Sequence, residues 1–88
     1  MTYRVEFTPG ARRDIVRLPE RIAWAVLEFC GGPLAENPHR VGKPLVGDLT
    51  GLYSARRGEY RIIYSIYEET VVVEVAYVRR WADAYRRR

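Results

Sequence analysis

The stretch LYSARRGEYRIIYSI, residues 52–66, decides how this chain folds. It contains two runs with the character of β-strands, Leu52–Arg57 and Tyr60–Ile66, and Gly58-Glu59 joins them. Glycine in the first central position suits a two-residue type II′ turn, because that position needs a positive φ. The stretch therefore predicts a β-hairpin.

The register of this hairpin would bring two arginines together. The two-residue turn sets Arg57 opposite Tyr60 and Arg56 opposite Arg61. Directly opposed residues share a face of the sheet, and two like charges there cost roughly 0.2–1 kcal/mol. A sequence built only for stability would avoid this pair, whereas a sequence built to hold phosphate would use it.

The length and composition indicate one small soluble domain, residues 1–88, with 48% hydrophobic and 30% charged residues. No apolar run approaches the ~20 residues of a membrane span, and the charged N-terminus has no signal-peptide core. We therefore expect a cytoplasmic protein that contacts no membrane. Cys30 is the single cysteine, so a disulfide framework and a cysteine-based metal site are excluded, and we expect it in the core.

The net charge of +4 is unevenly placed. Residues 1–50 carry seven Lys/Arg against six Asp/Glu, whereas residues 51–88 carry eight against five. A basic C-terminal half points to a polyanion or an acidic partner, and the alternative is an ordinary solvated basic surface.

The N-terminal half predicts a strand followed by two helices. Residues 3–7 alternate between apolar and charged side chains, which is typical of a half-buried strand. Thr8-Pro9 then provides an N-cap and a first helical residue for a helix to about residue 18. A second helix starts at Pro19-Glu20, and we expect the run Gly31-Gly32-Pro33 to end it. Trp24 lies on the flank of its apolar stripe, either in the core, which we favour, or on a partner surface.

Residues 37–51 have no hydrophobic period and are expected to form a loop. His39 has no second histidine or cysteine near it and is interpreted as an ordinary loop histidine. Arg40 and Lys43 could border a phosphate site or be solvated.

Three strands should follow as an antiparallel meander, at residues 52–57, 60–66 and 70–78. With Glu68-Glu69 as the second turn, the helices should cover one apolar face. Its expected members are the pairs Ile66–Val71, Tyr64–Val73 and Ile62–Val75, together with Tyr60 and Tyr77. The open face should carry Ser54, Arg56, Arg61, Ile63, Ser65, Glu74 and Ala76. The order β-α-α-β-β-β predicts an α+β fold, a helical hairpin packed on an antiparallel sheet, with residues 79–88 as a short helical tail.

The sequence lacks the motifs of most enzymes, including a phosphate-binding loop, a zinc-binding HExxH and a GxSxG nucleophile turn. The remaining candidates for a functional site are arginine and tyrosine residues. Arg56, Arg61 and either Arg79 or Arg80 can converge on one face of the sheet, and Tyr85 can reach it from the tail. Arginine stays ionised and forks onto phosphate oxygens, while tyrosine can stack on a base or exchange a proton. This pattern indicates nucleic-acid binding more specifically than catalysis.

Three segments carry a family resemblance, and together they cover nearly the whole chain in order. YRVEFTPGARRDIVRLP, GKPLVGDLTGLYSARRGEYRIIYSI and VEVAYVRRWADAYR closely resemble the RelE branch of the RelE/ParE toxin superfamily. The resemblance implies the toxin of a type II toxin–antitoxin pair that enters the ribosomal A site and cuts messenger RNA (mRNA). It also implies a reaction without metal or cofactor, in which a 2′-hydroxyl attacks the adjacent phosphate. The implied partners are the ribosome with its mRNA and a small, acidic, partly disordered antitoxin similar to RelB.

The resemblance also assigns residues. The family's arginine after the conserved Gly-Tyr falls on Arg61, the basic residue of the preceding strand on Arg56, the terminal tyrosine on Tyr85, and the C-terminal arginine on Arg79 or Arg80. Ser54 stands where some members have a second lysine. The common Gly-His-Arg run is here Arg79-Arg80-Trp81, so it offers no histidine base. The RNA-binding candidates are Lys43, Ser54, Arg57 and Trp81.

Two other functions stay open from the sequence. One is a ParE-like inhibitor that binds DNA gyrase and cuts nothing, and the other is an inactive module that only binds an antitoxin. The ParE branch lacks the arginine and tyrosine set, so the presence of both Arg61 and Tyr85 argues against it.

Overall fold

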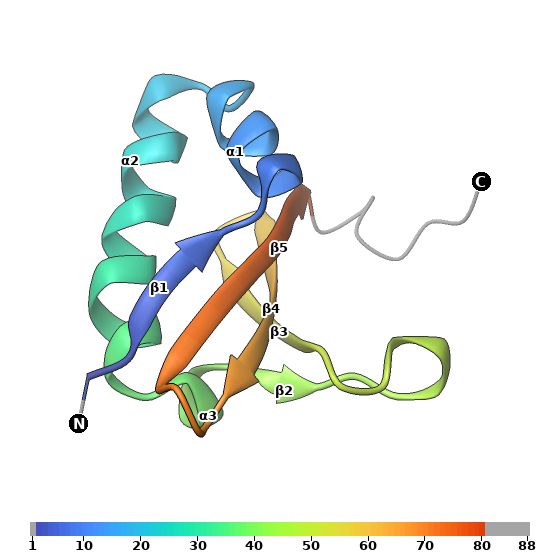
Figure 1. Ribbon diagram of the computed structural model, residues 1–88. Coiled ribbons are helices and arrows are strands. Elements are labelled where there is room, and N and C mark those ends of the chain that lie inside the picture. Colours follow the sequence, from blue (N-terminus) through green and yellow to red (C-terminus); the bar gives the residue numbers. More distant parts are fainter. Residues whose placement is uncertain (1, 81–88) are drawn as a thin grey trace.

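The structure is a computed structural model that describes residues 2–80, and it contains one five-stranded sheet covered by helices (Figure 1). The strands are β1 (Arg4–Phe7), β2 (Lys43–Pro44), β3 (Tyr53–Arg57), β4 (Tyr60–Tyr67) and β5 (Val72–Arg80), and they lie in the order β1-β5-β4-β3-β2. The predicted α+β class is confirmed. The sheet is not purely antiparallel, however, because β1 pairs with β5 in parallel.

The hairpin from β3 to β4 has the predicted register. Arg56 lies opposite Arg61, and Arg57 lies opposite Tyr60. Gly58 adopts a φ of 63°, a conformation that glycine takes at no steric cost. The two arginines therefore share the face of the sheet that the register predicted.

The turn between β4 and β5 is longer than predicted. It spans residues 68–71, and the Val71 N–H donates to the Glu68 carbonyl at 3.3 Å. Val71 has a φ of 56°, which is rare for a β-branched residue. The prediction of a turn at Glu68-Glu69 is wrong, and the pairing is displaced by two residues. The resulting pairs are Ile66–Val73, Ser65–Glu74 and Tyr64–Val75.

A β-bulge between Ile63 and Tyr64 then changes which residues of β5 face the helices. Beyond the bulge, Ile63 lies opposite Tyr77, and Ile62 lies opposite Val78 rather than Val75. Val78 therefore occupies the core position, and the prediction that Tyr77 lies on the helix-covered face is wrong. The extra residue of a bulge breaks the strict alternation on which that prediction depended.

The first helix begins as the sequence predicted. In α1 (Pro9–Val16), Thr8 is the N-cap, and its hydroxyl accepts a hydrogen bond from the Ala11 N–H at 3.0 Å. The same hydroxyl donates to the Ala76 carbonyl of β5 at 2.6 Å. This residue thus caps the helix and ties it to the sheet.

The second helix does not end where the sequence predicted. After α2 (Glu20–Phe29), the run Gly31-Gly32-Pro33 lies inside a π-helical turn, η1 (Cys30–Leu34). A wider turn suits proline, which has no N–H and clashes with the carbonyl four residues earlier in an α-helix. Cys30 and Leu34 are both buried, so the continued turn places apolar side chains in the core.

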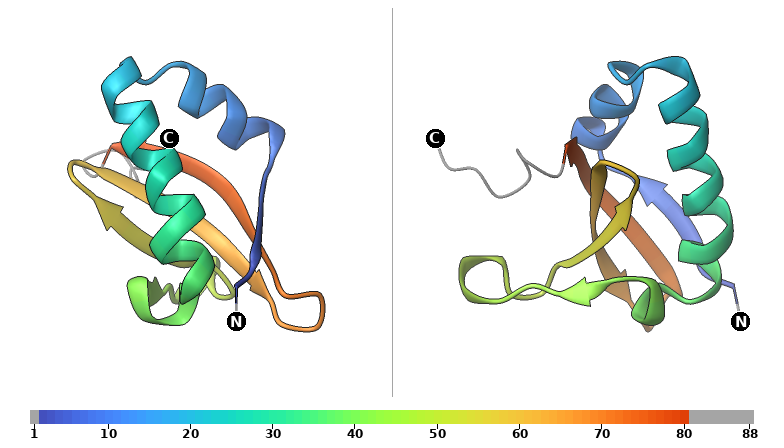
Figure 2. Two further views of the ribbon diagram at one scale, coloured as in Figure 1. Left: turned by 90° about the vertical axis from the view of Figure 1, so that its left-hand side faces the viewer. Right: turned by 180° about the vertical axis from the view of Figure 1, so that it is seen from behind.

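The core lies between the helices and one face of the sheet, and Figure 2 shows α2 running across that face. Its buried members are Ala11, Val26, Cys30, Leu34, Ala55, Ile62, Tyr64, Val73, Val75 and Val78. Cys30 is in the core as predicted, and its burial raises the pKa of the thiol to about 12. Trp24, by contrast, is 62% exposed, so the preference for a core position is wrong. No helix within residues 2–80 is long and apolar enough to cross a membrane.

Candidate functional site

The segment predicted as a loop, residues 37–51, is partly ordered into short elements. It contains α3 (Pro38–Val41), β2 and the 3₁₀ turn η2 (Gly47–Leu49). Strand β2 pairs with β3, where Lys43 lies opposite Ser54. This pairing brings α3 and β2 to the edge of the sheet beside the two arginines of the hairpin.

A hollow of about 360 Å³ lies between this segment and the hairpin. It is on the sheet face opposite the helices, because Ser54, Arg56 and Arg61 alternate with the core residues of their strands. The lining residues are Arg40, Val41, Gly42, Lys43, Ser54, Arg56 and Arg61. The structure thus brings together four of the sequence's cationic candidates at one place.

Hydrogen bonds fix Arg56 and Arg61, the two arginines that line the hollow. Arg61 donates from Nη1 to the Ser54 hydroxyl at 3.2 Å, and Ser54 is only 4% exposed. Arg56 donates from Nε to the Gly58 carbonyl at 3.1 Å. One guanidinium is therefore held by the neighbouring strand and the other by the turn.

A core residue, Tyr64, holds the α3 side of the hollow in place. The Tyr64 hydroxyl donates to the Pro38 carbonyl at 2.6 Å, and the Tyr64 ring stacks on Tyr53 with centroids 5.6 Å apart. Burial, together with the nearby Tyr53, raises the pKa of the Tyr64 phenol, so it stays protonated as a donor. A Cβ at Gly42 would lie 2.1 Å from the Tyr64 hydroxyl and 3.0 Å from the Ser54 carbonyl oxygen. Only glycine therefore lets this segment approach the sheet so closely.

The charge of the hollow is of one sign. Three arginines and one lysine line it, and none of the described residues that line it is acidic. A concave surface with a single sign of charge attracts and concentrates counter-ions. Arginine adds a planar fork of donors that matches phosphate oxygens. The arrangement is suited to binding the backbone of a nucleic acid.

His39, on α3, is not the isolated loop histidine that the sequence indicated. Its ring pairs with the Glu68 carboxylate and makes an edge contact with the Tyr53 ring. The Tyr3 hydroxyl donates to the other Glu68 oxygen at 2.8 Å. The hydrogen bonds from Tyr3 and His39 lower the pKa of Glu68, and the bond to Glu68 raises the pKa of Tyr3. This cluster joins α3 to the N-terminus and to the turn after β4.

The structure does not bring Arg79 or Arg80 into the hollow. The Arg79 Cα lies opposite that of Arg61, but its guanidinium pairs with Asp14 of α1. Arg80 approaches Glu59 at 3.8 Å. Asp14 carries no signal in the sequence, because a single acidic residue on a helix is usually solvated.

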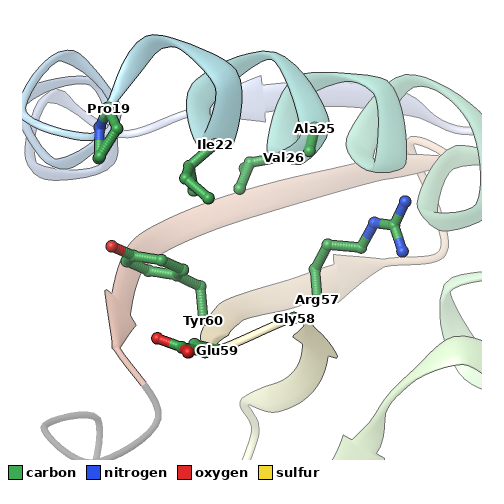
Figure 3. Close-up of a pocket in the computed structure, with 8 residues that line it drawn as sticks. All are labelled: Pro19, Ile22, Ala25, Val26, Arg57, Gly58, Glu59 and Tyr60. Carbon is green, nitrogen blue, oxygen red and sulfur yellow. The ribbon is translucent and has the colours of Figure 1, made fainter.

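Arg57 lies on the other side of the hairpin from Arg56. Figure 3 shows its side chain directed toward α2, above the hairpin turn. The groove there measures about 450 Å³ and is lined by Pro19, Ile22, Ala25, Val26, Arg57, Gly58, Glu59 and Tyr60. Arg57 is therefore not brought together with the other RNA-binding candidates.

Trp81 and Tyr85 lie outside the described residues. Across residues 2–80, no group of three or more His, Cys, Asp or Glu residues could hold a metal ion.

Comparison with known proteins places this geometry in context. The family described as the ParE toxin of the type II toxin–antitoxin system parDE matches residues 5–85. The toxin RelE of Mycobacterium tuberculosis is 52% identical over 84 residues, which cover 96% of this chain and 87% of that protein. The toxin RelG of the same organism is 52% identical over 87 residues, covering 99% of this chain and 100% of the relative.

Solved structures show the same fold. The toxin–antitoxin complex RelBE2 of Mycobacterium tuberculosis contains a chain with a TM-score of 0.89 and 49% identity, covering 91% of this chain and 99% of that one. The archaeal RelE–RelB complex of Pyrococcus horikoshii gives a TM-score of 0.74 at 30% identity, with 96% and 100% coverage.

Proposed function

This chain belongs to the ParE toxin family of type II toxin–antitoxin systems, and we propose that it is a RelE-like toxin that cuts mRNA in the ribosomal A site. The observation that carries the proposal is the cationic hollow on the open face of the hairpin. Arg56 and Arg61 lie opposite each other there, and Arg40 and Lys43 extend the positive surface along α3 and β2. Opposed like charges cost stability in a free protein, so an anionic ligand is the natural reason to retain them.

The reaction we propose is an attack of the 2′-hydroxyl on the adjacent phosphate. The bond to the 5′-oxygen of the next nucleotide breaks, which leaves a 2′,3′-cyclic phosphate and a 5′-hydroxyl. Charge accumulates on the phosphate oxygens in the transition state, and preorganised donors aimed at that charge contribute most to such a rate. Arg61 would stabilise these oxygens because the Ser54 hydroxyl orients its guanidinium. Arg56 would hold the scissile phosphate and share the charge.

The remaining roles are proposed from the family resemblance. Arg79 or Arg80 would assist at the leaving oxygen, and Tyr85 would stack on the substrate or remove its proton. Lys43, with Arg40 beside it, would contact flanking phosphates from the other side of the hollow. In this mechanism the arginines supply the positive charge, so the proposed reaction uses no metal ion or cofactor.

The ribosome would supply what the toxin lacks. The lining residues of the hollow provide charge and hydrogen bonds but no strong base. Orientation of reacting groups alone can lower a barrier by about 7–11 kcal/mol. A ribosome that holds the 2′-hydroxyl in line with the phosphate would make the reaction fast without such a base.

An antitoxin is the second partner we propose. The solved complexes above pair relatives of this chain with RelB antitoxins. A basic open face fits an acidic, partly disordered segment that orders on binding. We expect the antitoxin to occlude Arg61 or to displace residues 81–85.

The test is to cleave the same message free and during translation. We expect cuts at defined positions, mapped by primer extension, only when ribosomes translate the message. Efficient, specific cutting of free RNA would contradict the ribosome-dependent mechanism. The family that matches this chain is named for the ParE toxin, so gyrase supercoiling is measured in parallel. Inhibition of gyrase with an intact translated message would favour the ParE-like alternative, and inactivity in both assays would favour a module that only binds an antitoxin.

A further inference from the structure

Asp14 of α1 makes two contacts with the end of β5 through one oxygen. Its Oδ2 accepts a hydrogen bond from the Val78 N–H at 2.9 Å and also receives the guanidinium of Arg79. Strand β1 ends at Phe7, opposite Val75, so it cannot provide an acceptor for Val78. The first contact is therefore structural, because Asp14 satisfies a backbone donor beyond the end of the parallel pair.

The second contact decides where Arg79 points. The Arg79 Cα is the partner of the Arg61 Cα in the ladder between β4 and β5, so both side chains leave the sheet on the same face. Arg79 nevertheless extends over the Tyr77 ring, with its guanidinium carbon 4.8 Å from the centroid, to reach Asp14. It lines a second hollow, of about 390 Å³, together with Asp14, Arg17 and Arg80.

We propose that Asp14 is a positioning residue that holds Arg79 away from Arg61 until a substrate phosphate competes for its guanidinium. This inference rests on the proposed function, since it assumes an RNA phosphate beside Arg61. Without an anion, a third arginine next to Arg56 and Arg61 would add to their mutual repulsion. Asp14 neutralises that charge at the edge of the sheet instead.

The pair is exposed enough to be exchanged. The Arg79 side chain is 45% exposed, whereas that of Asp14 is 15% exposed and also fixed by Val78. Surface ion pairs are weak, and a phosphodiester offers the guanidinium two oxygens that it can bind through two parallel hydrogen bonds. Asp14 therefore stays with the helix when the pair opens, and Arg79 is the mobile member.

Two substitutions separate the roles of Asp14. Asp14→Asn keeps an oxygen that can accept from the Val78 N–H but removes the charge that holds Arg79. Asp14→Ala removes both, and a lower unfolding temperature for this variant alone would report the structural contact. Glu28→Gln is the matched control, because it changes the net charge equally from an exposed position on α2.

The measurement is binding of a short single-stranded RNA with 2′-deoxy substitutions, which cannot be cut by 2′-hydroxyl attack. Affinity is followed by fluorescence anisotropy over a range of salt concentrations. Each phosphate neutralised contributes about 0.7 to the salt slope for single strands, and this slope should be equal in Asp14→Asn and Glu28→Gln, because Arg79 reaches the phosphate in both. We expect Asp14→Asn to bind about 2- to 5-fold more tightly than Glu28→Gln, because the phosphate no longer competes with an exposed ion pair, and we expect Arg79→Ala to abolish this gain in the double variant.

The outcomes are distinct. Equal affinities for Asp14→Asn and Glu28→Gln, including no binding by either, overturn the proposal, as does a gain in affinity that survives Arg79→Ala. Cleavage of a translated message is scored separately for the unmodified chain. Cleavage with equal affinities removes this inference and leaves the proposed function, whereas the gain in affinity without cleavage does the reverse.

Discussion

The two faces of the hairpin from β3 to β4 differ around the opposed pair of Arg56 and Arg61. Arg56 and Arg61 project into the cationic hollow, while their neighbours Ala55 and Ile62 are buried under the helices. One face has opposed like charges, which cost stability, and the other buries apolar side chains, which provide it. The same stretch of backbone thus carries the proposed binding site on one face and the core on the other.

This difference teaches that function and stability should be separable at adjacent positions. A strand turns successive side chains to opposite faces, so a change at one position reaches the other face only through the backbone. The connection is closest where α3 and β2 meet the sheet, because Tyr64 of the core face donates to Pro38 of that segment. The predictions below therefore go from the core face to the hollow and then to that segment.

The largest effect is expected on the core face. Ile62 is fully buried, and Ile62→Ala should destabilise the fold by about 2–5 kcal/mol, because it removes apolar contacts and leaves a cavity. Val16→Ala is the control, since Val16 is 82% exposed and should change stability by no more than about 0.5 kcal/mol. Denaturant unfolding of both variants measures the difference. Similar stabilities for the two would mean that β4 is not the centre of the core.

On the open face, Arg61→Ala should affect the reaction rather than the fold. Loss of one preorganised donor to a developing oxyanion typically costs about 10²–10³ in rate. Relief from Arg56 and loss of the bond to Ser54 act in opposite directions, so stability should change by less than about 1 kcal/mol. Cleavage of a translated message and thermal unfolding are measured together.

Arg57→Ala is the matched control for Arg61→Ala. It removes the same charge from the same hairpin, but Arg57 lines the groove under α2 (Figure 3). We expect Arg57→Ala to retain most of the cleavage of a translated message. An Arg61→Ala variant that folds and keeps full cleavage activity would remove Arg61 from the transition state, and one that unfolds would make it structural.

The features that the sequence predicted correctly depend on residues close together in the chain. Gly58 marked the turn, a two-residue turn fixes its register, and the pairing of Arg56 with Arg61 followed. Thr8 and Pro9 likewise predicted the start of α1, because a cap is satisfied within one helical turn. Each of these signals involves residues close together in the chain.

The part that could not be predicted depends on distant contacts. Val71 adopts a positive φ with no residue in its turn that favours one, so the β4 to β5 register was displaced by two. The bulge after Ile63 then reversed the face of Tyr77. At Gly31-Gly32-Pro33 the burial of Cys30 and Leu34 outweighed the signal to end the helix.

The candidate site likewise has residues that the sequence predicted and residues whose position only the structure shows. Arg56 and Arg61 were found from the hairpin alone, and Arg40 and Lys43 were noted only as bordering residues. Their approach to the hairpin requires α3 and β2, which have no hydrophobic period to reveal them. The partner of Arg79 could not be found from the sequence, since 65 residues of chain separate it from Asp14.

A smaller effect is expected where the two faces are connected. Gly42→Ala would place a Cβ 2.1 Å from the hydroxyl of the fully buried Tyr64, which cannot move aside freely. We expect a loss of about 1–3 kcal/mol from this overpacking. Gly31→Ala is the control, because its Cβ would meet nothing within 4 Å and alanine favours a helix. Equal stability of the two variants in denaturant would show that α3 and β2 are not held against the core.

The smallest effect concerns the pH dependence of the same segment. The hydrogen bonds from Tyr3 and His39 hold the pKa of Glu68 below its usual value. A carboxylate with a lowered pKa stabilises the fold above its unfolded pKa, near 4.5, and loses that contribution as the pH falls through the folded value. Glu68→Gln should therefore unfold at a slightly lower temperature than the unchanged protein at neutral pH, and the gap should close in acid. Glu69→Gln removes an equal charge from the same turn and is the matched control. If the gap between Glu68→Gln and the unchanged protein is constant from neutral pH into acid, the cluster of His39, Glu68 and Tyr3 does not anchor α3 beside the hollow.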